Sequence, residues 1–389
     1  MEGGAERRQL ASLTSLRGIA ALLVALYHFS GGFLPNLHLD RGSELIAKSY
    51  LWVDFFFILS GFIMMHAYGR EFRDAVDWGR FRLFLAARFA RVYPLHLVLL
   101  AAFVLLELGK WLLGRADLLA LYSPAFSTAD AKSPFALLLN LLMLQSSGLL
   151  DRLTWNGPAW SVGAEWYAYL AFPLLGLVLQ RQSWRGRIGL LGAAWAGLVL
   201  LDLAGGGLDL TYDYGMLRCL FEFAFGTALY LVYERARGEP WPCGRSFAPA
   251  CFAATLLLLH LGAPDLLLPP VFCLLILAVA LDGAGGGRLL ASRPLVFLGE
   301  ISYAVYLSQL FVLQLTDMGW RAVSGQPFGA SLSAGQSLLA LAVLLGLLLG
   351  LSTLLHRWVE TPARRALRRL GGSRRLAGGA EDALPAAGS

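Results

Sequence analysis

Two ionisable side chains, Arg17 and His28, interrupt an otherwise apolar stretch of membrane-spanning length near the N-terminus. Eleven positions separate them, so in a helix both side chains lie within about 20° of one face and about 16 Å apart along the axis. Ionisable groups inside a bilayer are costly and mark candidate sites of proton transfer or substrate binding. The alternative is that Arg17 reaches the interface and that His28 bonds a neighbouring carbonyl.

An acidic residue, Asp54, opens the apolar segment WVDFFFILSGFIM at 52–64. A carboxylate among phenylalanines needs a partner. If the first span runs outward and the second inward, His28 and Asp54 reach a similar depth near the outer side. The sequence therefore predicts a pair in which Asp54 orients the imidazole and raises its basicity. The alternative is an Asp54 that only caps the second helix.

The segment RFARVYPLH at 88–96 places Arg88 and Arg91 one turn apart on one helical face, just before Pro94. Paired guanidinium groups suit a phosphate or pyrophosphate because their fork geometry permits bidentate hydrogen bonds. The alternative is that these arginines only mark a cytoplasmic flank.

A third acidic segment, NGPAWSVGAEWYAYLAFP at 156–173, places Ser161 and Glu165 at i and i+4. The two side chains share a helical face, about two turns from the outer mouth of the predicted helix. A carboxyl group buried in such a helix is expected to be hydrogen-bonded or functional.

Two further motifs lie nearer the C-terminus. GEISYAVYLSQ at 299–309 places Tyr303 and Tyr306 one turn apart, and in HRWVETPARR at 356–365 Glu360 lies among arginines. Taken singly, these motifs are typical of aromatic packing and of an interfacial salt bridge.

The composition indicates the kind of protein that positions these residues. Of 389 residues, 57% are hydrophobic and 15% are charged, and the mean hydropathy is +0.60. These values exclude an ordinary soluble domain and predict an all-α polytopic membrane protein. The four cysteines have no metal-ligand spacing, so no metal is expected. The net charge of +6 is concentrated in particular loops, so it reports topology and does not indicate a nucleic-acid partner.

Apolar stretches of spanning length and arginine-dense loops together predict the topology. The alternation of sides is consistent only if one of 81–107 and 134–150 does not cross, and Pro94 favours 81–107 as the broken element. The prediction is about ten transmembrane helices plus one broken or re-entrant segment, with both termini cytoplasmic. The expected units are a transmembrane domain at 1–370 and a flexible cytoplasmic tail at 371–389. The eleven candidate stretches are 13–34, 49–69, 81–107, 134–150, 158–180, 188–204, 214–233, 249–263, 266–282, 296–317 and 334–357.

Taken together, these motifs resemble the membrane-bound acyltransferase 3 family in its stand-alone form, over roughly residues 10–370. Members transfer an acyl group, usually acetyl from acetyl-CoA, to sugars of surface polysaccharides and related acceptors. Where many members carry a His after the SYxxYL element, this chain has Gln309, so no second imidazole is carried over. The motifs that carry the resemblance are the Arg17 and His28 spacing, DFFFILSGF, the Arg88, Arg91 and Pro94 cluster, N-x-P-x-W-S followed by Glu165, SYxxYL at 302–307 and E-x-P at 360–362.

The resemblance implies roles on the acceptor side. His28 is expected to act as the base for an acceptor hydroxyl, oriented by Asp54, while Glu165 binds the acceptor or shares in proton transfer. Further lining of the site is expected from Ser60, Asn156, Trp160, Ser161, Tyr306 and Glu360.

On the donor side, Arg88 and Arg91 are expected to hold the CoA phosphates, and Arg17 to meet the pantetheine or stabilise charge. The implied function is an acetyl-CoA-dependent O-acyltransferase of a bacterial inner membrane. Its acceptor would be a hydroxyl of a carbohydrate or lipid-linked sugar of the cell envelope. The competing hypothesis is a secondary transporter, for which inverted repeats would be expected, and the sequence shows none.

Overall fold

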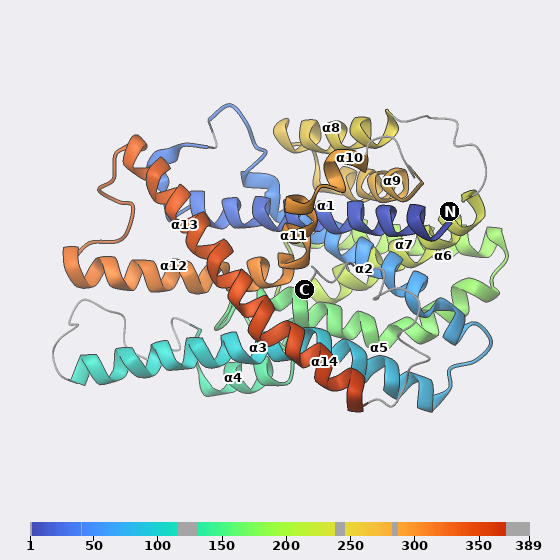
Figure 1. The fold of residues 1–389 in the computed structure, drawn as a ribbon, viewed down its shortest axis with the longest axis horizontal. Coiled ribbons are helices and arrows are strands. Elements are labelled where there is room, and N and C mark those ends of the chain that lie inside the picture. The colour runs from blue at the N-terminus through green and yellow to red at the C-terminus, as the bar shows by residue number, and fades with distance from the viewer. Residues whose placement is uncertain are drawn as a thin grey trace.

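The computed structural model describes residues 2–39, 41–115, 126, 131–237, 246–281 and 287–370, in which all regular structure is helical. The predicted tail at 371–389 lies outside these residues. Most long helices run roughly along one direction, and α13 crosses them diagonally (Figure 1). The helices are α1 (Glu2–Ser30), α2 (Trp52–Tyr68), α3 (Trp78–Arg115), α4 (Pro134–Leu141), α5 (Ala159–Arg181), α6 (Trp184–Gly205), α7 (Gly215–Ala236), α8 (Phe247–His260), α9 (Leu268–Leu281), α10 (Gly287–Leu290), α11 (Arg293–Glu300), α12 (Ser302–Ser324), α13 (Ala334–Leu355) and α14 (Thr361–Leu370). Short helical turns are η1 (Pro35–Leu37), η2 (Ala47–Leu51), η3 (Gly69–Phe72), η4 (Asp265–Leu267) and the π-helix η5 (His356–Glu360).

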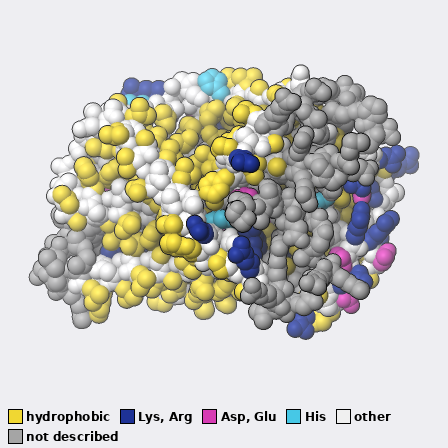
Figure 2. All heavy atoms as spheres, viewed as in Figure 1, with side chains coloured by type: hydrophobic (Ala, Val, Ile, Leu, Met, Phe, Trp, Pro, Cys, Tyr) yellow, Lys and Arg dark blue, Asp and Glu magenta, His cyan; other side chains and the backbone are white. Residues whose placement is uncertain are grey.

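The predicted all-helical class is confirmed. Seven helices among the described residues are long and apolar enough to cross a membrane, or eight if α11 and α12, bent by 64° against each other, form one span. Helices α8 and α9 are apolar but shorter, with 14 residues each. Hydrophobic side chains cover much of the left part of the face in Figure 2, as expected of a surface that meets lipid.

The broken element is not the one that the sequence favoured. The segment 81–107 belongs to α3, a continuous helix of 38 residues with Pro94 inside it. The segment 134–150 instead forms only the eight-residue α4 and turns, and the left-handed backbone of Met143 (φ 57°) follows the end of that helix. Pro94 supplies no N–H to the Ala90 carbonyl, yet α3 continues through it, and Tyr303 of α12 supports the same turn by donating to the Val92 carbonyl at 2.7 Å.

Close glycine contacts set the depth of the helices that carry candidate site residues. A Cβ atom on Gly61 of α2 would lie 2.1 Å from the Phe223 carbonyl oxygen of α7, and one on Gly226 of α7 would lie 1.8 Å from that of Ile58. Only glycine allows the two backbones to approach this closely. The contact holds Ser60, which directly precedes Gly61, at a fixed depth in the bundle.

The helix that carries Arg17 is held in the same way. A Cβ atom on Gly299 of α11 would lie 1.9 Å from the Thr14 carbonyl oxygen, and one on Gly18 of α1 would lie 2.7 Å from the Gly299 nitrogen. The pairs α1 with α11 and α2 with α7 make the most extensive helix contacts in the protein. These two interfaces form the frame on which the candidate site is built.

Candidate active site

The centre of the bundle holds a short hydrogen-bonded group of polar side chains from α2 and α5. The hydroxyl of Ser60 donates to the Glu165 carboxylate at 2.5 Å and lies 3.5 Å from the hydroxyl of Tyr169. Tyr169 is buried, whereas Ser60 and Glu165 are each partly exposed. The bonded role predicted for Glu165 is therefore confirmed, with Ser60 as the partner.

Arg17 lies near this group. Its charge interacts with those of Glu165 and Arg91, yet it makes no hydrogen bond or ion pair to the described part of the chain. The residue is partly exposed, so its guanidinium is not sealed in the core. An unsatisfied cation at this depth is costly unless a ligand or water completes its hydrogen bonds.

A second carboxylate, that of Glu360, contacts three basic side chains. Its Oε2 atom lies 3.3 Å from Nη1 of Arg91, 2.8 Å from Nη2 of Arg364 and 3.6 Å from Nδ1 of His356. The salt bridge expected of this segment is present. The π-helical turn η5 carries Glu360, and such turns are frequent at functional sites. Arg364 was not singled out in the sequence, although it lies one turn after Glu360.

Arg88 and Arg91 contact different partners. The Nη2 atom of Arg88 donates to the Tyr68 hydroxyl at 2.8 Å, and its guanidinium carbon lies 5.1 Å from the centre of that ring. Arg88 is buried, with 4% of its surface exposed, whereas the Arg91 side chain is 16% exposed. Of the predicted phosphate-binding pair, Arg91 is therefore the more accessible residue, and Arg88 ties α3 to α2.

The imidazole of His28 is oriented by its own helix. Its Nδ1 atom lies 3.0 Å from the Val24 carbonyl oxygen. A carbonyl oxygen only accepts, so Nδ1 carries the hydrogen and Nε2 keeps a lone pair. The Gln309 side chain lies beside the ring. Both amide atoms of Gln309 are buried and have no hydrogen-bond partner in the described residues.

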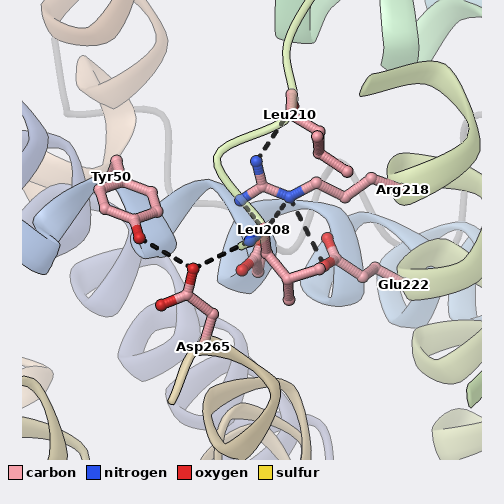
Figure 3. A network of polar contacts seen from close by, with 7 residues as sticks. Tyr50, Leu208, Leu210, Arg218, Glu222 and Asp265 are labelled. Carbon is pink, nitrogen blue, oxygen red and sulfur yellow. Dashed lines mark hydrogen bonds and ion pairs between the residues drawn. The ribbon is translucent and has the colours of Figure 1, made fainter. Parts of the chain in front are cut away.

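The predicted pair of His28 and Asp54 is wrong. The Oδ1 atom of Asp54 accepts from Arg218 Nε at 2.7 Å and also from Arg218 Nη2. Arg218 further donates to the Leu210 carbonyl at 3.1 Å and lies 3.8 Å from a Glu222 carboxylate oxygen (Figure 3). The physical reason is that Arg218 is fully buried on α7, and a buried guanidinium without a carboxylate partner costs far more free energy than a neutral imidazole without one.

A neighbouring carboxylate, Asp265, ties three more segments together. It accepts from the Tyr50 hydroxyl and from the Leu208 backbone nitrogen, both at 2.9 Å (Figure 3). It also accepts from Lys48 Nζ at 2.6 Å. Asp265, Arg218 and Glu222 were not predicted from the sequence. The signal that was overlooked is the presence of Arg218 and Glu222 inside the apolar stretch 214–233, where ionisable residues need partners.

The remaining predicted lining residues fall into two places. Ser161 donates to the Tyr306 hydroxyl at 2.9 Å, and Asn156 donates to the Leu307 carbonyl at 2.9 Å, so both join the start of α5 to α12. Trp160 instead lies under Arg218, whose guanidinium carbon is 5.7 Å from the ring centre. Ser161 and Tyr306 therefore belong near the candidate site, and Trp160 packs against the buried Arg218.

Comparisons with known proteins show which family the chain belongs to. Residues 10–357 match the family model Acyl_transf_3, described as an acyltransferase domain. Acyltransferase MdmB of Streptomyces mycarofaciens is 28% identical over 400 aligned positions that cover 93% of each chain. Protein 2 in picA locus of Rhizobium radiobacter is 36% identical over 160 positions, 39% of this chain and 73% of that protein.

No solved structure shows significant similarity to this chain. The family match covers most of the chain, including the apolar helices and the polar side chains at their centre. The chain is an integral membrane protein that belongs to the acyltransferase 3 family.

Proposed function

We propose that this protein transfers an acyl group, in the first place acetyl, from acyl-CoA to a hydroxyl of a carbohydrate or lipid-linked sugar of the cell envelope. The observation that carries the proposal is a set of three partly exposed ionisable residues inside the bundle, His28, Arg17 and Glu165. Family membership favours this enzyme over the secondary transporter.

His28 is the proposed general base. Its Nε2 atom takes the proton of the acceptor hydroxyl while the hydroxyl oxygen bonds to the acyl carbon. The carbon–sulfur bond of the thioester then breaks, and the leaving thiolate receives the proton from the imidazolium. The tautomer held by Val24 supports this role because it leaves Nε2 free to accept.

Gln309 is the proposed donor to the oxyanion that forms on the acyl oxygen. Its amide lies beside His28, within reach of a hydrogen bond to the imidazole, and is buried without a partner elsewhere among the described residues. Pre-placed donors without competing partners are what stabilises developing negative charge. In this proposal the amide at 309 supplies a hydrogen bond and has no part in moving protons.

Acyl-CoA is proposed to approach from the side of Arg91 and Arg364. Both guanidinium groups converge on one oxygen of Glu360, and of the two arginines Arg91 is proposed to turn further N–H groups to phosphate oxygens. Arg17 would meet the donor between these arginines and His28. Arg88 would act indirectly, by holding Tyr68 and with it the end of α2.

The proposed topology has ten crossings, in which α8 and α9 cross as short spans and α4 does not. Both termini then lie in the cytoplasm, where arginine-rich loops are expected. In that orientation His28 lies toward the outer side, where an envelope acceptor is present. The proposed location is a bacterial inner membrane.

Replacement of His28 by alanine tests this function. In purified protein reconstituted with acetyl-CoA and an acceptor glycan, His28→Ala should lower acyl transfer at least about 100-fold, as expected for loss of general-base catalysis. The matched control is His260→Ala, because the His260 side chain is exposed and bonds only Ser43 in the described residues. Near-normal transfer by His28→Ala, with the control also active, would remove His28 from the mechanism.

A further inference from the structure

A pocket of about 580 Å³ lies where η3, α5, α6 and α7 end or begin at one end of the bundle. None of the residues proposed to contact acyl-CoA lines it. Its cationic lining consists of Arg70, Arg73, Arg187 and Arg235. It is therefore a separate cavity with a strong positive charge.

Three of the four arginines have guanidinium groups that the protein leaves available. Arg70, Arg73 and Arg235 are exposed and make no hydrogen bond or ion pair to the described residues. Arg187 is used by the fold, because it donates to the carbonyls of Leu179 and Gln180 at 2.8 and 3.3 Å. Free guanidinium groups around one cavity fit the oxygens of a phosphate group.

The pocket has one acidic lining residue, Glu234, among those described. Its carboxylate lies 3.9 Å from Arg237, so another cation already offsets its charge. The lining thus keeps a net positive charge toward a bound ligand. An anion is the ligand that this charge favours.

The pocket also borders a helix surface that faces lipid. Only 17% of the α6 span is buried inside the protein, the smallest share among the candidate spans. Trp184, which lines the pocket in the first turn of α6, is 52% exposed, and Ile188 one turn later is 55% exposed. Tryptophan at a helix end is typical of the membrane interface, with lipid tails beside the adjoining apolar turns.

We propose that this pocket binds the phosphate head group of an anionic phospholipid, with the acyl chains along α6. Basic pockets between the ends of membrane helices have the charge and the location that such head groups require. The lipid would hold together the ends of α2, α5 and α7, helices that carry Ser60 and Glu165. The inference does not depend on which acyl donor or acceptor the enzyme uses.

The test compares two double variants with the same change in charge. Arg70→Gln/Arg235→Gln removes two pocket arginines, and Arg82→Gln/Arg185→Gln removes two exposed arginines from the same end of the bundle that do not line it. Each protein is placed in nanodiscs of phosphatidylglycerol and phosphatidylcholine. It is then released from them, and the lipid molecules that stay bound to the protein are counted by native mass spectrometry. CoA binding is measured on the same samples.

Retention of phosphatidylglycerol should fall at least about tenfold in the pocket variant and stay at the wild-type level in the control, with CoA binding unchanged in both. Equal retention in both variants would show that the pocket holds no lipid. Unchanged lipid retention with CoA binding weakened only in the pocket variant would assign the pocket to the nucleotide end of the donor. Either result overturns the lipid proposal.

Discussion

Two groups of polar and charged side chains on the described helices differ in how far they are buried and in whether their cation is paired. The closed network, Asp54, Arg218 and Glu222, is fully buried, and its one guanidinium faces both carboxylates, hydrogen-bonded to Asp54 and 3.8 Å from Glu222. The open cluster, Arg17, Ser60 and Glu165, is partly exposed and its cation has no hydrogen bond to the described residues. A fully buried cation that is paired with carboxylates holds helices together, whereas a partly exposed cation without such a partner is available to a ligand.

The two groups occupy neighbouring positions on the same helix. Asp54 and Ser60 are both on α2, less than two turns apart, and the Gly61 contact presses this helix against α7. The closed network fixes the rotation of α2 relative to α7. It thereby also fixes the direction in which Ser60 presents its hydroxyl to Glu165.

The largest effect is expected when the closed network is broken. Arg218→Leu leaves Asp54 and Glu222 buried without their cation, which should lower the free energy of unfolding by about 3–5 kcal/mol. Thermal unfolding in detergent measures this loss. The control is Arg152→Leu, which removes an exposed pair with Asp151 and should cost about 0–1 kcal/mol. A wild-type melting temperature for Arg218→Leu would refute the structural role of the network.

The opposite pattern is expected in the open cluster. Glu165→Gln keeps the size of the side chain and a hydrogen-bond acceptor for Ser60, so the melting temperature should stay near that of the wild type. Activity should fall at least about 100-fold, which corresponds to about 2.7 kcal/mol in the transition state. Steady-state kcat/KM and thermal unfolding of the same preparation check both halves. Loss of stability without specific loss of activity would place Glu165 with the closed network.

Much of the open cluster could be predicted from the sequence because isolated charged residues in apolar stretches indicate it. Arg17 and Glu165 each stand alone in apolar surroundings, as does His28 outside the cluster, and isolated ionisable residues in spans are visible without a structure. Their partners could not be predicted in the same way. Asp54 pairs with Arg218, 164 positions away, because α2 packs closely on α7, and no local pattern encodes that rotation.

In the fold, too, the features that are local in the sequence could be predicted, and those that depend on packing between helices could not. Hydropathy located the helices because apolar length is a local property. The choice of the broken segment depended on Pro94, whose effect is decided by neighbouring helices. In this protein α12 reaches the same turn through Tyr303, and α3 stays continuous.

A smaller effect is expected from the cation of the open cluster. Arg17→Lys keeps the positive charge but loses the planar fork, so it should raise the KM for acyl-CoA about tenfold, or about 1.4 kcal/mol, with little change in stability. Isothermal titration with CoA and steady-state kinetics measure the change. A KM that rises for the acceptor instead of the donor would move Arg17 to the other substrate.

The smallest effect is expected from the hydroxyl that joins the open cluster to the frame. Ser60→Ala removes one hydrogen bond to Glu165, so kcat/KM should fall about fivefold, close to 1 kcal/mol, because the Tyr169 hydroxyl remains nearby. The matched control is Ser308→Ala, since Ser308 is a buried serine whose hydroxyl donates to the Ala304 carbonyl of its own helix at 2.7 Å. If both variants lose the same small amount of stability but only Ser60→Ala loses activity, the hydroxyl at 60 orients the Glu165 carboxylate. An equal loss of activity in both would mean that the fall reflects packing of the bundle and not that hydrogen bond.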